Sequence, residues 1–305
     1  MTKNRAYHIP VMLQPCLDGL NIDPNGVYVD VTFGGGGHSR VIHELLSSQG
    51  RLISFDQDPD AAKNAWEAAN FSFVAANFAF FTNHLRLQGV MQVDGILADL
   101  GVSSHQFDEE SRGFSIRGEA PLDMRMNQEG ELTAAKVLNE YSEEDLIALF
   151  RAYGEINNAP KLVRLISAQR RSTKFKTTVQ LMDIARECAT PRKENKYFAQ
   201  VFQALRIEVN DEMSALQQFL ESCERAIKPG GRLVVMSYHS LEDRMVKNYM
   251  KRGSIKGEIT KDFYGNVLKP FTEIIRKPIV PTEEEIEQNS RARSAKLRIA
   301  ERNGE

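Results

Sequence analysis

Four consecutive glycines at positions 34–37 lie two residues after a β-branched and aromatic run at 27–31. Apolar residues recur at helical spacing in residues 39–48, so the glycines join an expected strand to an expected helix. Glycine lets the backbone approach a ligand closely, and a helix N-terminus offers N–H groups to it. The pattern predicts a ligand-binding loop at one edge of a parallel sheet.

The first hundred residues repeat this alternation. Expected strands lie at 27–31, 51–55, 71–76 and 93–98, with expected helices at 39–48 and 60–69. Strand–helix alternation predicts βαβ units and a parallel sheet, and near-continuous apolar strands suit a sheet covered on both faces.

The alternation stops after residue 108, where a loop-like stretch and then helical patterns extend to residue 222. Strand patterns return at 230–237, 271–275 and 296–300. We therefore expect an α/β domain formed by residues 1–107 and 205–305. A helical domain, residues 108–204, is inserted between its fourth and fifth strands.

An acid follows the second expected strand. Asp56 stands 20 residues after Gly36, where a carboxylate can accept hydrogen bonds from two ribose hydroxyls. The dinucleotide fingerprint would place a third glycine where Ser39 stands. A carboxylate at Asp30 suits a ligand with an amino-acid moiety, such as S-adenosylmethionine. A nicotinamide cofactor and a tight turn without a ligand stay open as alternatives.

Positive charge is concentrated in the expected insertion. Residues 161–206 carry eleven Lys or Arg against three acids, a net +8, while the rest carries 28 bases against 38 acids, a net −10. Further bases gather at 244–256 and 291–298. A base-rich face on an acidic protein is typical of polyanion binding. The alternative is an ordinary solvated helix surface.

Cysteine and histidine usage gives no sign of a metal site. The three cysteines lie far apart, at 16, 188 and 223, and the six histidines form no paired cluster. We expect neither a zinc ribbon nor a disulfide framework, and a sparse, odd cysteine count suits a reducing cytosol.

Six motifs in order resemble the MraW family, also called ribosomal RNA small subunit methyltransferase H. They are DVTFGGGGHS at 30–39, DGILADLGVSS at 94–104, RGFS at 112–115, PLDMRM at 121–126, SYHSLEDR at 237–244 and RARSAKLR at 291–298. The resemblance covers nearly the whole chain. Two local departures are Tyr238, where the family pattern has Phe, and Ser290, where it has Pro.

The resemblance implies a bacterial cytoplasmic enzyme with a Rossmann-like methyltransferase sheet and an inserted substrate-recognition domain. Such an enzyme transfers a methyl group from S-adenosylmethionine to the exocyclic N4 amine of a cytidine in 16S rRNA, at the decoding centre. The expected partner is 16S rRNA or the 30S ribosomal subunit. No membrane partner is expected, and a homo-oligomer stays open.

Carried over residue by residue, the resemblance places the cofactor contacts on seven residues. They are Gly36, Gly37, His38, Asp56, Phe80, Asp99 and Gln106. Asp99 ends the fourth expected strand and is the nearest acidic candidate to receive a proton from the amine. A nicotinamide-dependent oxidoreductase and a non-catalytic RNA-binding protein are the alternative functions.

Overall fold

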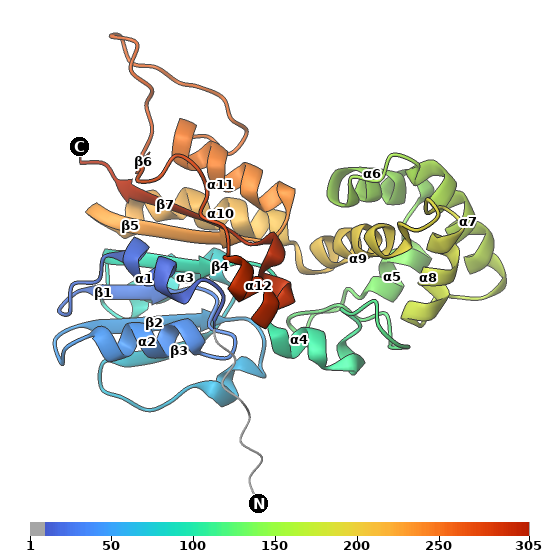
Figure 1. The fold of residues 1–305 in the computed structure, drawn as a ribbon, viewed down its shortest axis with the longest axis horizontal. Helices are drawn as coiled ribbons and strands as arrows, with labels where there is room; N and C mark the ends of the chain where they lie inside the picture. The colour runs from blue at the N-terminus through green and yellow to red at the C-terminus, as the bar shows by residue number, and fades with distance from the viewer. Residues whose placement is uncertain (1–9, 305) are drawn as a thin grey trace, which may run out of the picture. The chain divides into compact units, whose positions relative to one another are not determined.

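The computed structural model describes residues 10–304, apart from the side chains of residues 104 and 105. The chain divides into two compact units (Figure 1). Met1–Gly101 and Ser214–Glu305 form the first unit, and Val102–Met213 forms the second. The helical insertion expected at 108–204 lies wholly within the second unit.

A seven-stranded sheet forms the centre of the first unit, in the order β3-β2-β1-β4-β5-β7-β6. Its strands are β1 (Val27–Asp30), β2 (Arg51–Asp56), β3 (Phe71–Ala75), β4 (Val93–Asp99), β5 (Ile227–Ser237), β6 (Phe271–Glu273) and β7 (Lys296–Arg302). Strands β1 to β5 pair in parallel, whereas β7 is antiparallel to β5 and β6. The α/β fold expected from the sequence is confirmed.

Helices cover both faces of this sheet (Figure 1). They are α1 (Leu13–Leu20), α2 (Gly37–Leu45), α3 (Phe81–Leu87), α10 (Glu212–Ala226) and α11 (Ser240–Arg252), while the short α12 (Glu283–Gln288) has no buried residue. On one face, Cys16 of α1 and Ile42 of α2 are buried with Leu97 of β4. On the other, the rings of Phe81 and Phe219 pack with centroids 5.5 Å apart, which joins α3 to α10.

The segment between β2 and β3 differs from the expected helix at 60–69. Only Ala61–Asn64 is helical, as a single 3₁₀ turn, and Ala65 is extended. The ring of Trp66 stacks on Phe71, the first residue of β3, with centroids 3.9 Å apart. Burying this ring pair holds the chain against the start of β3, and alanine helix propensity is too weak a preference to override such packing.

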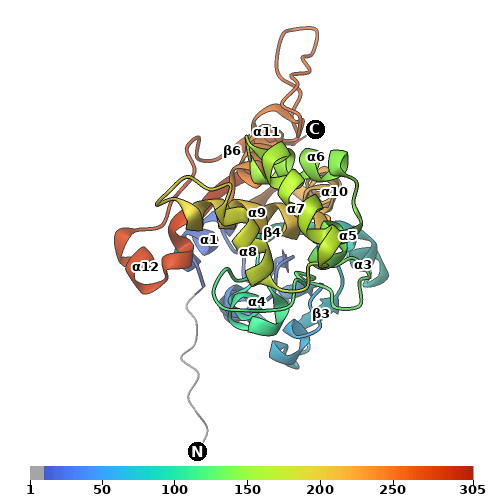
Figure 2. The ribbon, with the colours of Figure 1, turned by 90° about the vertical axis from the view of Figure 1, so that its right-hand side faces the viewer.

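The second unit is helical and has its own core (Figure 2). Its helices are α4 (Ser104–Asp108), α5 (Ala134–Glu140), α6 (Glu143–Gly154), α7 (Ala159–Ser172), α8 (Thr178–Arg186) and α9 (Glu194–Asn210). Ser142 caps α6 by accepting from the backbone N–H of Asp145. Among residues 10–304, no helix combines the length and apolar character needed to cross a bilayer.

The RGFS and PLDMRM motifs form one hydrogen-bonded loop in the second unit. The buried Arg112 donates from Nη2 to the carbonyls of Arg125 and Met126. Arg125 in turn forms a two-pronged ion pair with Asp123. Gly113 has φ 72°, and a Cβ there would lie 2.1 Å from the carbonyl oxygen of Pro121. The residues of both motifs therefore stabilise this loop, which explains their presence without a bound ligand.

Candidate active site

The glycine loop, residues 34–37, joins the carboxyl end of β1 to α2. Gly34 and Gly36 have φ of 52° and 75°, in the left-handed region that favours glycine. A Cβ on Gly36 would lie 2.9 Å from Cζ of Phe33, so the loop itself requires glycine there. A Cβ on Gly35 would meet no atom within 4 Å. The Gly35 face of the loop is therefore open to a ligand.

Asp56 ends β2 beside this loop. Its Oδ2 accepts from the N–H of Gly34 at 2.7 Å, and its Oδ1 accepts from the N–H of Asp58 at 2.8 Å. Each oxygen has a second lone pair that can accept from a ribose hydroxyl. Burial raises the pKa of Asp56 to about 6, against the effect of the two backbone hydrogen bonds. At neutral pH it is therefore mainly a carboxylate, as a ribose acceptor must be.

Asp30 is buried and binds residues on both sides of the glycine loop rather than facing a ligand. Its side chain is 1% exposed, and burial raises its pKa. Oδ2 accepts from the hydroxyl of Ser39 at 2.6 Å, and Oδ1 accepts from the backbone N–H of Thr32 at 3.1 Å. From the sequence, Asp30 was expected to suit the amino-acid moiety of the cofactor. In the structure its two oxygens instead accept hydrogen bonds from Ser39 and Thr32.

Asp99 ends β4, with its carboxylate between two side chains of the same unit. Tyr238 donates from its hydroxyl to Oδ1 of Asp99 at 2.8 Å. His38, the second residue of α2, places Nδ1 3.8 Å from Oδ2 of Asp99. The Nε2–H of His38 donates to the carbonyl of Val11 at 3.1 Å, which fixes the ring. Three elements thus converge on one carboxylate.

The backbone register explains this convergence. Asp99 pairs with Met236 across β4 and β5, so Tyr238 follows just beyond the same sheet edge. The backbone N–H of Asp99 donates to Oγ1 of Thr32 at 2.7 Å, which ties the end of β4 to the chain after β1. Carboxyl ends of parallel strands are where open α/β sheets bind ligands.

Burial raises the pKa of Asp99 to about 6, the largest effect on that group. The nearby His38 and the hydrogen bond from Tyr238 oppose the rise. The pKa of Tyr238 is raised well above its ordinary value by burial and by the Asp99 charge, so the phenol stays protonated and donates. A carboxylate with a pKa near 6 is more basic than an ordinary aspartate and can accept a proton at neutral pH.

Phe80 lies at the carboxyl side of β3 and is 52% exposed. Its neighbours Phe78 and Phe81 both pack on Phe219 with ring centroids 5.5 Å apart. The exposed ring is therefore no part of the core and is free to pack on a flat ligand group such as adenine.

Gln106 belongs to the second unit and is buried there. Its Oε1 accepts from the N–H of Ser103 at 3.0 Å, while the hydroxyl of Ser103 accepts from the N–H of Gln106 at 3.2 Å. This reciprocal pair caps the start of α4. A role for Gln106 toward the cofactor stays a prediction.

Two residues of this arrangement were not singled out as site residues from the sequence. Thr32 bridges Asp30 to the backbone of Asp99, and Tyr238 holds the Asp99 side chain. The signal in the sequence is Tyr238, at a position where the resemblance led us to expect Phe; its hydroxyl reaches Asp99.

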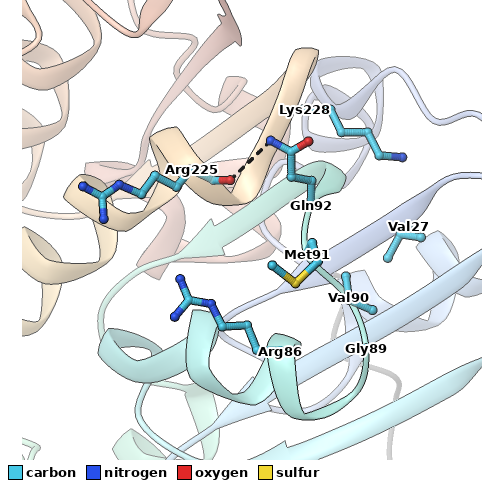
Figure 3. Close-up of a pocket in the computed structure, with 8 residues that line it drawn as sticks. All are labelled: Val27, Arg86, Gly89, Val90, Met91, Gln92, Arg225 and Lys228. Atoms are coloured by element: carbon cyan, nitrogen blue, oxygen red, sulfur yellow. Dashed lines mark hydrogen bonds between the residues drawn. The ribbon is translucent and has the colours of Figure 1, made fainter.

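A hollow of about 620 Å³ lies at the opposite edge of the sheet (Figure 3). Its lining includes Val27, the first residue of β1, and Lys228, near the start of β5. Gln92 donates across it to the carbonyl of Arg225 at 3.5 Å. Because it lies at the amino ends of the parallel strands, this hollow is separate from the glycine loop and Asp99.

Some of the bases counted in the sequence hold the protein together. Arg170 donates from Nη1 to the carbonyls of Leu138 and Tyr141 at 2.9 and 2.8 Å. Arg206 forms an ion pair with Glu212 at 2.7 Å. These two arginines are structural, which lowers the charge available to a polyanion on residues 161–206.

The C-terminal basic motif is similarly engaged. Arg298 and Lys296 both pair with Asp243 of the SYHSLEDR motif, at 2.7 and 3.1 Å, and their hydrogen bonds lower the pKa of that carboxyl. Exposed bases nevertheless remain in the second unit. Examples within residues 161–206 are Arg164, Arg171, Lys174, Lys176, Arg192, Lys193 and Lys196.

The fold and the site together define a class. Dinucleotide-binding sheets have six strands in the order 3-2-1-4-5-6. The sheet of this chain instead inserts an antiparallel β7 between β5 and β6, which is the arrangement of S-adenosylmethionine-dependent methyltransferases. The open face at Gly35 and the acceptor at Asp56 fit the methionine and ribose parts of that cofactor.

Comparison with known proteins gives the family. The model of the MraW methylase family matches residues 5–303, and the chain belongs to that family. S-adenosylmethionine is therefore its methyl donor, and the nicotinamide alternative is set aside.

Three similar relatives are each named Ribosomal RNA small subunit methyltransferase H. The protein of Amoebophilus asiaticus is 53% identical over 299 residues, which cover 97% of this chain and 96% of the relative. That of Flavobacterium johnsoniae is 53% identical over 302 residues, covering 99% and 100%. That of Porphyromonas gingivalis is 54% identical over 305 residues, covering 98% of each.

Proposed function

We propose that this methyltransferase modifies the exocyclic N4 amine of a cytidine in 16S rRNA, at the decoding centre of the small ribosomal subunit. Its substrate is the free rRNA or the assembled 30S subunit, and it acts in the cytoplasm. The name shared by the relatives supports an rRNA substrate. The exposed bases of the second unit support binding to a polyanion.

The observation that carries the chemistry is the Asp99 carboxylate, held by Tyr238 at the edge of the sheet that also bears the glycine loop. A cytidine amine is a weak nucleophile because its lone pair is delocalised into the ring. S-adenosylmethionine supplies an electrophilic methyl group. Asp99 orients the amine through hydrogen bonds and accepts its proton, a role that its raised pKa suits.

The remaining residues of the site hold the cofactor in this proposal. Gly36, Gly37 and His38 face its methionine part, Asp56 accepts from the ribose hydroxyls, and Phe80 packs on adenine. Gln106 and Asp99 complete the set. His38 is not the general base in this scheme, which assigns that role to Asp99; the His38 ring is buried and held by the carbonyl of Val11.

The target base must leave any stack or duplex before it can reach Asp99. The exposed bases of the second unit, such as Arg171 and Lys174, neutralise phosphates of the bound rRNA in this proposal.

Methyl transfer from labelled S-adenosylmethionine tests the function. Small subunits and naked 16S rRNA that lack the modification are incubated with the protein, digested to nucleosides and analysed. The proposal predicts label in N4-methylcytidine and in no other nucleoside. Label in another nucleoside, or none with either substrate, would refute it.

A further inference from the structure

A β-hairpin between α11 and β6, residues 256–269, carries two aromatic rings that are almost fully in solvent. We name it the aromatic hairpin. Phe263 is 97% exposed and Tyr264 is 86% exposed. Their ring planes are 88° apart, with centroids at 5.7 Å. In Figures 1 and 2 this orange segment extends as a thin loop beyond α11 and β6.

The tip of this hairpin is ordered by its own hydrogen bonds. Oδ1 of Asp262 accepts from the backbone N–H groups of Tyr264 and Asn266 at 2.9 and 2.8 Å. Oδ2 accepts from the side-chain amide of Asn266 at 2.9 Å. Gly265 has φ 88°, which completes the turn. The rings are thus presented on a preformed turn, which reduces the ordering cost of binding.

Basic residues flank the rings in the sequence. Residues 251–270 contain five bases and two acids, a net +3, although the whole chain has a net charge of −2. Of the two acids, Asp262 is engaged in the turn. The five bases are Lys251, Arg252, Lys256, Lys261 and Lys269. Exposed rings among lysines are typical of surfaces that stack unpaired bases and neutralise phosphates.

The hairpin is remote from Asp99 within its unit. β5 ends at Ser237 on the cofactor edge, and α11 returns toward the opposite edge. There Phe271, the first residue of β6, pairs with Arg302, the last residue of β7, and β6 runs in the same direction as β5 because both are antiparallel to β7. The aromatic hairpin therefore leaves the sheet from the amino edge and takes no part in the chemistry.

We propose that the aromatic hairpin is a second RNA contact, in which Phe263 and Tyr264 stack on unpaired bases distant from the nucleotide to be methylated. The inference rests on the proposed function, since it takes rRNA as the substrate. It explains why rings that fill no core are held in solvent beside lysines, and it makes recognition depend on a large RNA.

The test compares three double variants of the rings. Phe263→Ala with Tyr264→Ala removes both aromatic rings. Phe263→Leu with Tyr264→Leu keeps apolar surface but has no aromatic ring on which a base can stack. Phe263→Tyr with Tyr264→Phe keeps both rings. Leu87→Ala, at a site 83% exposed on α3, is the matched surface control.

Binding of 16S rRNA and the KM of methyl transfer are measured on naked 16S rRNA, on 30S subunits and on a short oligonucleotide around the target. The Ala and Leu variants should raise Kd and KM for 16S rRNA about thirtyfold or more, the order expected for two lost base stacks. The ring-swap variant and Leu87→Ala should match wild type. kcat, cofactor affinity and activity on the oligonucleotide should stay unchanged.

Four outcomes would overturn the proposal. Unchanged RNA binding in the Ala variant removes the contact, and wild-type binding by the Leu variant indicates apolar docking instead of stacking. A defect on 30S subunits alone indicates a protein partner, and a change in sedimentation mass indicates a second copy. If wild type binds 16S rRNA without forming N4-methylcytidine, the proposed function fails while the binding series still decides the role of the hairpin.

Discussion

The hydroxyl of Tyr238 donates a 2.8 Å hydrogen bond to Oδ1 of Asp99, joining the ends of β5 and β4. This bond fixes the orientation of the carboxylate and leaves Oδ2 on the side of His38. The bond depends on the hydroxyl of Tyr238, which a Phe side chain lacks.

Tyr238→Phe should therefore move the acidic limb of the activity profile to higher pH. A hydrogen bond to an ionised carboxylate favours the ionised form and lowers its pKa. Loss of a bond to a charged group, about 1.5–3 kcal/mol, corresponds to a rise of about one pH unit or more from the present value. Single-turnover methyl transfer from pH 5 to 8 measures the shift.

Tyr249→Phe is the matched control, because it removes a phenol buried on α11 without touching Asp99. Its profile should coincide with that of wild type. If Tyr238→Phe also gives the wild-type profile, the bond to Asp99 has no influence on the chemistry.

Asp99→Asn should stabilise the fold at pH 8. The pKa of Asp99 rises from 3.8 to about 6 on folding, so the folded state holds this proton more tightly than the unfolded state. Its contribution to stability is complete below pH 4, declines as the pH rises to about 6 and is lost above that. Removing the buried charge should add on the order of 2 kcal/mol at pH 8 and little at pH 4. Denaturant unfolding at both pH values measures the free energy of unfolding of the variant and of wild type. If the variant is no more stable than wild type at pH 8, the buried Asp99 charge does not destabilise the fold.

Asp56→Ala should weaken S-adenosylmethionine binding. Two effects combine, since the ribose loses a charged acceptor and the N–H of Gly34 loses its partner. The expected loss is about 1.5–3 kcal/mol. Calorimetric titration gives the affinity, with Asp60→Ala as the control for removing a nearby carboxylate that pairs with Lys63. Similar affinities for both variants would leave Asp56 without its assigned role.

Valine substitutions in the glycine loop should distinguish two effects, the blocking of the space that the cofactor occupies and the strain on the loop backbone. Gly35→Val places its side chain in open space, so it should fold normally and lose cofactor binding. Gly36→Val meets Phe33 and a φ of 75°, so it should lower stability as well as binding. Thermal unfolding and cofactor titration distinguish the two effects. Full binding by Gly35→Val would show that the open face is not the cofactor site.

Replacing four exposed bases of the second unit should flatten the salt dependence of RNA binding. The variant combines Arg164, Arg171, Lys174 and Lys176, all changed to Ala. Each phosphate contact contributes about 0.7 to the slope of log K against log salt for a single strand, so the slope should fall by up to about 3. Arg170 is left intact because it binds the carbonyls of Leu138 and Tyr141.

The control for this series is Lys136→Ala with Arg151→Ala, two exposed bases elsewhere in the same unit. Cofactor affinity should be unchanged in both variants. Identical salt slopes for wild type and the quadruple variant would show that the four bases face solvent and not RNA.

The features predicted correctly from the sequence are those that depend on local residue patterns. The strands and the glycine loop follow from apolar runs and from glycine itself, so they form where expected. The helix expected at 60–69 is replaced by a 3₁₀ turn, because the packing of Trp66 on Phe71 depends on the folded sheet. The bond between Tyr238 and Asp99 depends on the register of strands far apart in the chain, and so does the burial that raises the Asp99 pKa.

The central claim is that Asp99 takes part in the methyl transfer itself. Its most direct test is the single-turnover rate of Asp99→Asn on 16S rRNA, with S-adenosylmethionine at saturating concentration and its Kd measured in parallel. The account predicts a rate lower by about 100-fold or more, the usual contribution of a positioned proton acceptor. This loss should remain when the cofactor concentration is high enough to saturate the variant. A wild-type rate at saturating cofactor would contradict it and leave Asp99 as a cofactor ligand alone.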